Sequence, residues 1–119
     1  MPKIKSFSFG SIVIDDEAHH HDVVIYPDGK VKQRKGRIWL FGAHSFKKEE
    51  LVELKEAGAE LIVIGTGTKN RAHLSSEAEN YAHQAELELI TLPSPEAADR
   101  LNQLVDKGKR AASIIHITC

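Results

Sequence analysis

The segment that most constrains the fold is the run of residues 61–68, with the sequence LIVIGTGT. Its first four residues are apolar and three of them are β-branched, which predicts a strand buried on both faces of a sheet. The Gly-Thr-Gly-Thr sequence that follows predicts a loop at the carboxyl end of that strand. Open α/β sheets bind their ligands at this position. The run therefore predicts an α/β fold and a place for a ligand, but no particular reaction.

The first third of the chain has the residue pattern of β structure. Strands are predicted at 6–9, 11–14, 23–26 and 30–34, and a further one at 37–41. The Pro-Asp-Gly sequence at 27–29 predicts a tight turn, because proline fixes φ and glycine accepts a positive φ. The polar segment 15–21 is predicted to be a surface turn.

Beyond residue 44 the apolar residues recur with helical spacing, in segments that alternate with short strands. Helices are predicted to start at Ser45, Ser76 and Ser94, each serine acting as the N-cap. Strands are predicted at 61–64, 87–92 and 111–117. Alternating helices and strands with short connections predict a mainly parallel sheet covered by helices. Residues 1–119 are expected to form a single domain, since no linker or repeat divides them.

Composition narrows the class of protein and its partners. The 16 basic and 17 acidic residues give a formal net charge of −1, so we expect no nucleic-acid partner and no attraction to an anionic membrane. The longest apolar run is about five residues, whereas a membrane span needs roughly 18. No segment has the pattern of a signal peptide, and there is one cysteine, Cys119. These features predict a cytoplasmic protein.

The glycine loop, residues 65–68, does not fit the two common nucleotide-binding patterns. Asn70 stands where the dinucleotide fingerprint has its third glycine, and Lys69 is followed by this asparagine rather than by Ser or Thr. Two interpretations stay open: a site for a small anion or small molecule, and a tight turn without a ligand. The candidate ligand-binding residues of the loop are Gly65, Thr66, Gly67 and Thr68.

Two histidines are candidates for an acid or base beside this loop. His44 precedes the first helix and His116 lies near the end of the last strand. A structural hydrogen bond is the alternative for His116, and a nucleophilic pair with Cys119 requires the strand to end before the tail. The triplet His19-His20-His21 has an acidic flank that includes Asp22, which favours a solvated turn over a metal site. We assign no metal and no cofactor.

The basic residues Lys30, Lys32 and Arg34 share one face of a predicted strand. They are interpreted as the solvent face of an antiparallel hairpin, where lysine also discourages pairing between sheet edges. A nucleic-acid contact is the weaker alternative for so local a patch.

Four motifs, in order, resemble the adipogenesis-associated Mth-domain family of small proteins, which includes a mitochondrial complex I assembly factor. They are YPDG at 26–29, His44-Ser45 before the first helix, LIVIGTG at 61–67 and IHITC at 115–119. The resemblance covers nearly the whole chain. It implies a three-layer α/β fold with a central mixed, mainly parallel sheet flanked by helices and an additional N-terminal β-rich layer.

The resemblance supplies no catalytic set, and the residues form no coherent catalytic constellation. The leading hypothesis is therefore a non-enzymatic module that binds or assembles another protein. The alternative is a small-molecule or anion binding protein, or an enzyme, that uses the glycine loop with His44 or His116. Because the resemblance implies a mixed sheet, the direction of the last strand decides whether His116 lies near the loop.

Overall fold

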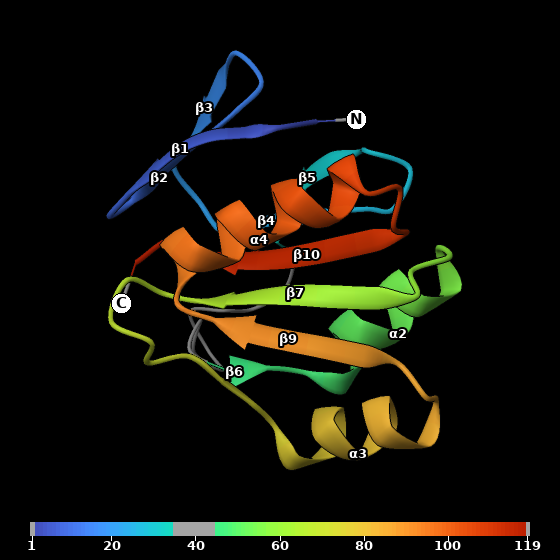
Figure 1. Cartoon of the computed structure of the whole chain (residues 1–119). Coiled ribbons are helices and arrows are strands. Elements are labelled where there is room, and N and C mark those ends of the chain that lie inside the picture. The colour runs from blue at the N-terminus through green and yellow to red at the C-terminus, as the bar shows by residue number, and fades with distance from the viewer. Residues whose placement is uncertain (1, 35–44, 119) are drawn as a thin grey trace.

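The main element of the computed structural model, which describes residues 2–34 and 45–118, is a five-stranded mixed sheet (Figure 1). The strand order is β5-β4-β10-β7-β9. Strands β10, β7 and β9 are parallel, whereas β4 is antiparallel to both β10 and β5. The predicted mixed, mainly parallel sheet is thus confirmed. The bounds are β4 (Val23–Ile25), β5 (Val31–Gln33), β7 (Leu61–Thr66), β9 (Glu88–Leu92) and β10 (Ala111–His116).

Helices cover both faces of this sheet and are α2 (Lys48–Glu56), α3 (Ser76–Gln84) and α4 (Ser94–Asp106). Strand β7 is buried along its whole length, as its apolar sequence predicts. Its side chains alternate between two apolar clusters because successive residues of a strand face opposite sides. Ile62 and Ile64 pack with residues of α2 and α3, and Val63 packs with residues of α4. The sheet therefore separates two cores.

The additional N-terminal layer is a three-stranded antiparallel sheet, β1-β2-β3, that lies on the α4 side (Figure 1). Its strands are β1 (Ile4–Ser8), β2 (Ser11–Ile14) and β3 (Glu17–His19). Ile12 and Ile14 belong to the same core as Val63. The prediction of a surface turn over 15–21 was wrong for β3, because pairing with β2 forms a strand that has no apolar pattern.

Two of the predicted helix starts are displaced by local contacts. Ser45 forms a strand residue of β6 (Ser45–Phe46), which pairs in parallel with β8 (His73–Leu74), so α2 starts later and Lys47 is its N-cap. The N-cap of α3 is Ser75 rather than Ser76, and its side chain accepts a hydrogen bond from the Ala78 amide at 3.1 Å. The strand predicted at 37–41 lies outside the described residues. Within the described ranges, no helix is long and apolar enough to cross a membrane.

Candidate functional site

The carboxyl ends of the parallel strands meet at one edge of the main sheet, which we call the carboxyl edge. Strand β10 runs parallel to β7 in a register that pairs His116 with Thr66. The last strand therefore places His116 beside the glycine loop. On the other side of β7, Leu92 at the end of β9 pairs with Gly65. The antiparallel strand β4 begins at this edge and β5 ends at it, so Asp22 and Arg34 also lie there.

The glycine loop packs tightly against the start of α4. A Cβ atom on Gly65 would lie 2.8 Å from Ser94 Oγ and 3.2 Å from Ser94 Cα, so this position requires glycine. Gly67 has φ of 99°, a conformation that glycine adopts without strain. Gly65, Thr66 and Gly67 are buried, and Thr68 is half-buried. The glycines thus permit a close βα connection.

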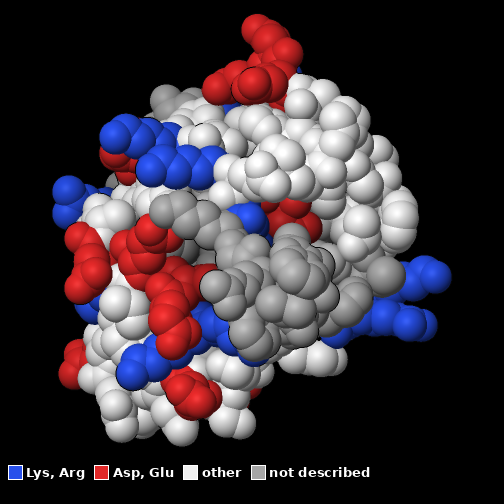
Figure 2. Space-filling model, turned by 180° about the vertical axis from the view of Figure 1, so that it is seen from behind, with Lys and Arg blue, Asp and Glu red and all other residues white. Residues whose placement is uncertain are grey.

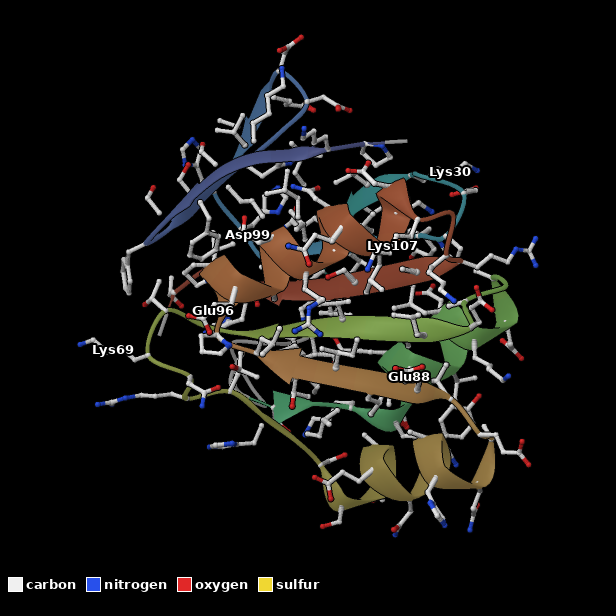
Figure 3. All side chains as sticks on the ribbon, viewed as in Figure 1. Lys30, Lys69, Glu88, Glu96, Asp99 and Lys107 are labelled. Carbon is white, nitrogen blue, oxygen red and sulfur yellow. The ribbon has the colours of Figure 1, made fainter. Side chains whose placement is uncertain are left out.

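The polar groups of the loop donate mainly within the protein. The Gly67 amide donates to Ser94 Oγ at 2.8 Å, and the Thr68 amide donates to the Thr118 carbonyl at 2.8 Å. The Thr66 hydroxyl contacts the Asn70 side chain and the Leu92 carbonyl. These contacts occupy two of the amides that an anion would use, and Lys69 extends away from the sheet in Figure 3.

Ser94 has a different role from the predicted N-cap. It is the first residue of α4, Pro93 precedes it as the cap residue, and its side chain is fully buried. Its hydroxyl donates to the His116 carbonyl at 2.5 Å while accepting from Gly67. One hydroxyl therefore ties the glycine loop, α4 and the last residue of β10 together.

A buried ionic cluster occupies the other side of His116. Asp22 Oδ2 accepts from Arg34 Nη1 at 2.9 Å, and both side chains are nearly inaccessible to solvent. Arg34 also donates from Nε to Glu50 Oε1 at 2.6 Å and from Nη2 to the Ser45 carbonyl at 2.7 Å. Its guanidinium lies 4.5 Å from the centre of the Phe46 ring. These bonds satisfy a buried cation whose desolvation would otherwise be costly.

The burial of Arg34 and Asp22 corrects two predictions. Arg34 is 3% exposed and does not lie on a solvent face with Lys30 and Lys32, which are exposed. Asp22 is 6% exposed and does not belong to a solvated acidic turn. The reason is α2, whose Glu50 supplies the second carboxylate that a buried guanidinium requires.

Asp22 orients His116. Asp22 Oδ2 lies 2.9 Å from His116 Nδ1, and Asp22 Oδ1 accepts from the Ile117 amide at 3.0 Å. Burial alone raises the pKa of Asp22, but the hydrogen bonds from His116, Ile117 and Arg34 outweigh burial and hold the pKa below its usual value of 3.8. An ionised Asp22 only accepts, so His116 Nδ1 carries a proton toward it, and His116 Nε2 lies 3.1 Å from Thr118 Oγ1.

The structure thus brings together His116 and all four residues of the glycine loop. His44 and Cys119 lie outside the described residues. Reasoning from the sequence missed Asp22, Arg34 and Thr118. Asp22 follows a polar run and Arg34 belongs to a series of basic residues, so neither could be recognised as buried from its neighbours in the sequence. Only Thr118 carried a local signal, since it stands two residues after a candidate histidine at the end of a strand.

The fold and this edge define a small α/β domain with a mixed sheet and an added β layer. A family model described as protein of unknown function (DUF498/DUF598) matches residues 4–116. The chain belongs to this family. No curated protein matches it significantly.

Solved structures agree with this assignment. The structure named MT938 is 30% identical with a TM-score of 0.84, and all of both chains is covered. A conserved hypothetical protein, PH1505 from Pyrococcus horikoshii, is 32% identical with a TM-score of 0.86, covering 98% of this chain and 99% of that one. A Mth938-like domain from Bordetella pertussis, 15% identical with a TM-score of 0.68 over 98% of this chain and 85% of its own, shares the fold. The resemblance to the Mth-domain family is confirmed.

Proposed function

We propose that this domain binds a partner protein by adding an extended segment of that partner to the open edge of β1. The observation that carries the proposal is a groove between β1 and α4. Strand β1 is terminal in the order β1-β2-β3, so within the described residues one of its edges pairs with no other strand. An unpaired strand edge presents N–H and C=O groups that can pair with an extended peptide.

The groove runs along this edge and has a volume of about 190 Å³. Residues 4–7 of β1 form one wall, and Pro95, Ala98 and Asp99 of α4 form the other. Figure 3 shows Asp99 on α4, near β1. A strand edge beside a helix wall supplies main-chain hydrogen bonds for affinity and side-chain contacts for selectivity.

One end of the edge already shows the kind of pairing that the proposal requires. The side chain of Asn102 accepts from the Ile4 amide at 3.0 Å and donates to the Ile4 carbonyl at 2.8 Å. An amide side chain of α4 thus takes the place that a neighbouring strand would have at Ile4. A partner segment would continue this pairing along residues 5–8.

The surroundings of the groove indicate the chemistry of the partner. Phe9, directly after β1, is 62% exposed and is the one large apolar side chain exposed among the described residues. Asp99 offers a carboxylate on the helix wall. Figure 2 shows the opposite face of the molecule, on which acidic and basic side chains lie close to one another, and the formal net charge of the chain is −1. A charge so close to zero suits a protein segment better than a polyanion. We expect a segment with apolar side chains and a basic residue that reaches Asp99.

A displayed library of random ten-residue peptides, selected on the immobilised chain, provides the probe. Selected peptides should contain a basic residue among apolar ones. On titration they should shift the backbone NMR signals of residues 4–8 and 95–99. The variant Asp99→Arg should weaken their binding about tenfold, because it removes the carboxylate and fills the groove.

Asp106→Arg is the matched control, since it makes the same substitution on the same helix outside the groove lining. It should leave peptide affinity unchanged. Equal weakening by both variants, shifts confined to α2 and α3, or a library that yields no binder would contradict the proposal.

A further inference from the structure

Three side chains at the carboxyl edge form a hydroxyl–imidazole–carboxylate chain. Thr118 Oγ1 lies 3.1 Å from His116 Nε2, and His116 Nδ1 lies 2.9 Å from Asp22 Oδ2. His116 and Asp22 are buried, whereas Thr118 is half-buried at the end of the arrangement. A nucleophile, a base and an acid that orients the base stand in this order in hydrolases that form acyl-enzymes.

The ionic cluster behind the imidazole favours the proton transfer that such chemistry needs. Asp22 and Glu50 carry two negative charges, and Arg34 carries one positive charge between them. An imidazolium formed at His116 would lie 2.9 Å from the Asp22 carboxylate, whose negative charge stabilises it. Arg34 and the Ile117 amide also fix the Asp22 carboxylate, and Asp22 in turn fixes the ring. The base is therefore oriented before any substrate binds.

Hydrogen bonds to the glycine loop also hold the main chain of Thr118 in place. The Thr118 carbonyl accepts from the Thr68 amide at 2.8 Å and from the Thr68 hydroxyl at 3.2 Å. Thr118, the second residue after β10, is thereby tied to the glycine loop, at the sheet edge where α/β folds place their reacting groups. Positioning by packed backbone is what distinguishes a prepared nucleophile from an ordinary surface threonine.

We propose that Thr118 is a nucleophile for acyl transfer from esters, with His116 as its general base. Thr118 Oγ attacks the ester carbonyl carbon while its proton passes to His116 Nε2. The tetrahedral intermediate then collapses, the bond to the alcohol oxygen breaks, and the proton on Nε2 goes to the departing alkoxide. Water, deprotonated by the same nitrogen, releases the acid and restores Thr118. Asp22 and Arg34 are positioning residues, and the site is separate from the β1 groove.

The probe is p-nitrophenyl acetate, applied to the full chain. We expect a burst of p-nitrophenolate and a single acetyl group on Thr118, located by mass spectrometry of the C-terminal peptide. Thr118→Val should lower the burst rate at least about 100-fold, because it replaces the nucleophilic hydroxyl by a methyl group and leaves the side chain nearly the same shape. Thr118→Ser should keep the activity, since it keeps the hydroxyl.

His116→Gln should lower the burst rate to a similar degree. Asp22→Asn should lower the acylation rate at saturating ester more than it changes the half-saturating concentration, because Asp22 acts only through the ring. His83→Gln and Thr91→Val, at exposed positions, are the controls and should react like the unmodified chain.

Three results would overturn the proposal: acetylation confined to lysines, a Thr118→Val burst equal to that of the unmodified chain, or an inactive Thr118→Ser that unfolds at the same urea concentration. Because Thr118 is half-buried, its two variants test the chemistry even if His116→Gln does not fold. The peptide-binding experiment tests the β1 groove, which is a different surface from the site at Thr118. The peptide-binding proposal and the acyl-transfer proposal can therefore fail independently.

Discussion

The carboxyl edge and the β1 groove use polar groups in opposite ways. At the carboxyl edge the charged groups are buried and already paired, as with Asp22 and Arg34. Along the β1 groove they are exposed, and Asn102 is the side chain that pairs with the strand edge, at Ile4, in the part of the chain that the structure describes. Buried paired charges fix geometry at a cost in desolvation, whereas an exposed edge can accept a partner without unfolding anything. The comparison predicts that substitutions at the first region change stability and those at the second change binding.

The largest effect is expected when the buried cluster loses its cation. Arg34→Ala would leave the buried Asp22 carboxylate without its cation, and Glu50 and the Ser45 carbonyl would each lose their bonds to the guanidinium. Removing one partner of a buried pair costs about 3–5 kcal/mol. Urea denaturation at neutral pH measures the loss. Lys32→Ala, at an exposed position of the same hairpin, is the control, and an equal small loss in both variants would mean that Arg34 contributes only as a surface residue.

A smaller loss is expected from Gly65→Ala. The new methyl group would lie 2.8 Å from Ser94 Oγ and 3.1 Å from Ile115 Cγ2, so α4 must shift away from β7. Overpacking of this kind costs about 1–3 kcal/mol. Thermal and urea unfolding report the change. Gly10→Ala tests a glycine with open space around its Cβ position, where only the positive φ is strained. If Gly65→Ala proved as stable as the unmodified chain, the tight contact between the loop and Ser94 would be excluded.

The stability of the fold is expected to depend on pH through Asp22. Hydrogen bonds from His116, Ile117 and Arg34 outweigh desolvation and lower the pKa of Asp22 in the folded state below its usual value of 3.8. The ionised carboxylate therefore contributes stability above about pH 3.8, and this contribution is lost as the pH falls toward the folded-state pKa. The slope is at most about 1.4 kcal/mol per pH unit for one proton.

Asp22→Asn isolates this contribution. The variant should be less stable than the unmodified chain at neutral pH, and the difference in free energy of unfolding should shrink below about pH 3.8. Urea titrations at intervals between pH 6 and pH 2 measure it. If the difference in free energy of unfolding stayed constant across this range, the pKa of Asp22 would be the same in the folded and unfolded states, which contradicts the prediction.

The elements that the sequence could predict are those with a local pattern. The strand at 61–64 is predictable because four apolar residues, buried on both faces of the sheet, form a continuous run. The strand predicted at 111–117 is also present and buried, although Ser113 and His116 interrupt its apolar residues. The helix over 94–106 was identified from its apolar spacing, although its first turn was interpreted wrongly. Periodicity and propensity depend on residues that are neighbours in the sequence. They can therefore be recognised without knowledge of the tertiary structure.

The carboxyl edge depends on pairings that local patterns do not contain. Asp22 and His116 are 94 residues apart and meet only because β4 runs antiparallel to β10. Arg34, directly after β5, is buried because Glu50 of α2 covers it, and no feature of the neighbouring sequence distinguishes it from Lys32. The position of the glycine loop was predictable from one strand, whereas its buried polar partners required the strand order of the whole sheet.

The smallest effect on stability is expected for residues in the groove and directly beside it. Phe9→Ser removes an aromatic ring that is 62% exposed, and Asp99→Arg changes a carboxylate at an exposed position, so each should change the free energy of unfolding by no more than about 0.5 kcal/mol. Both should nevertheless weaken the binding of selected peptides, because apolar contact and charge at the groove act only when a partner is present. Urea unfolding and fluorescence titration with one peptide, performed on the same preparations, measure the two quantities. A loss of stability comparable to that of Gly65→Ala would mean that the groove belongs to the core of the fold and that its residues are not available to a partner.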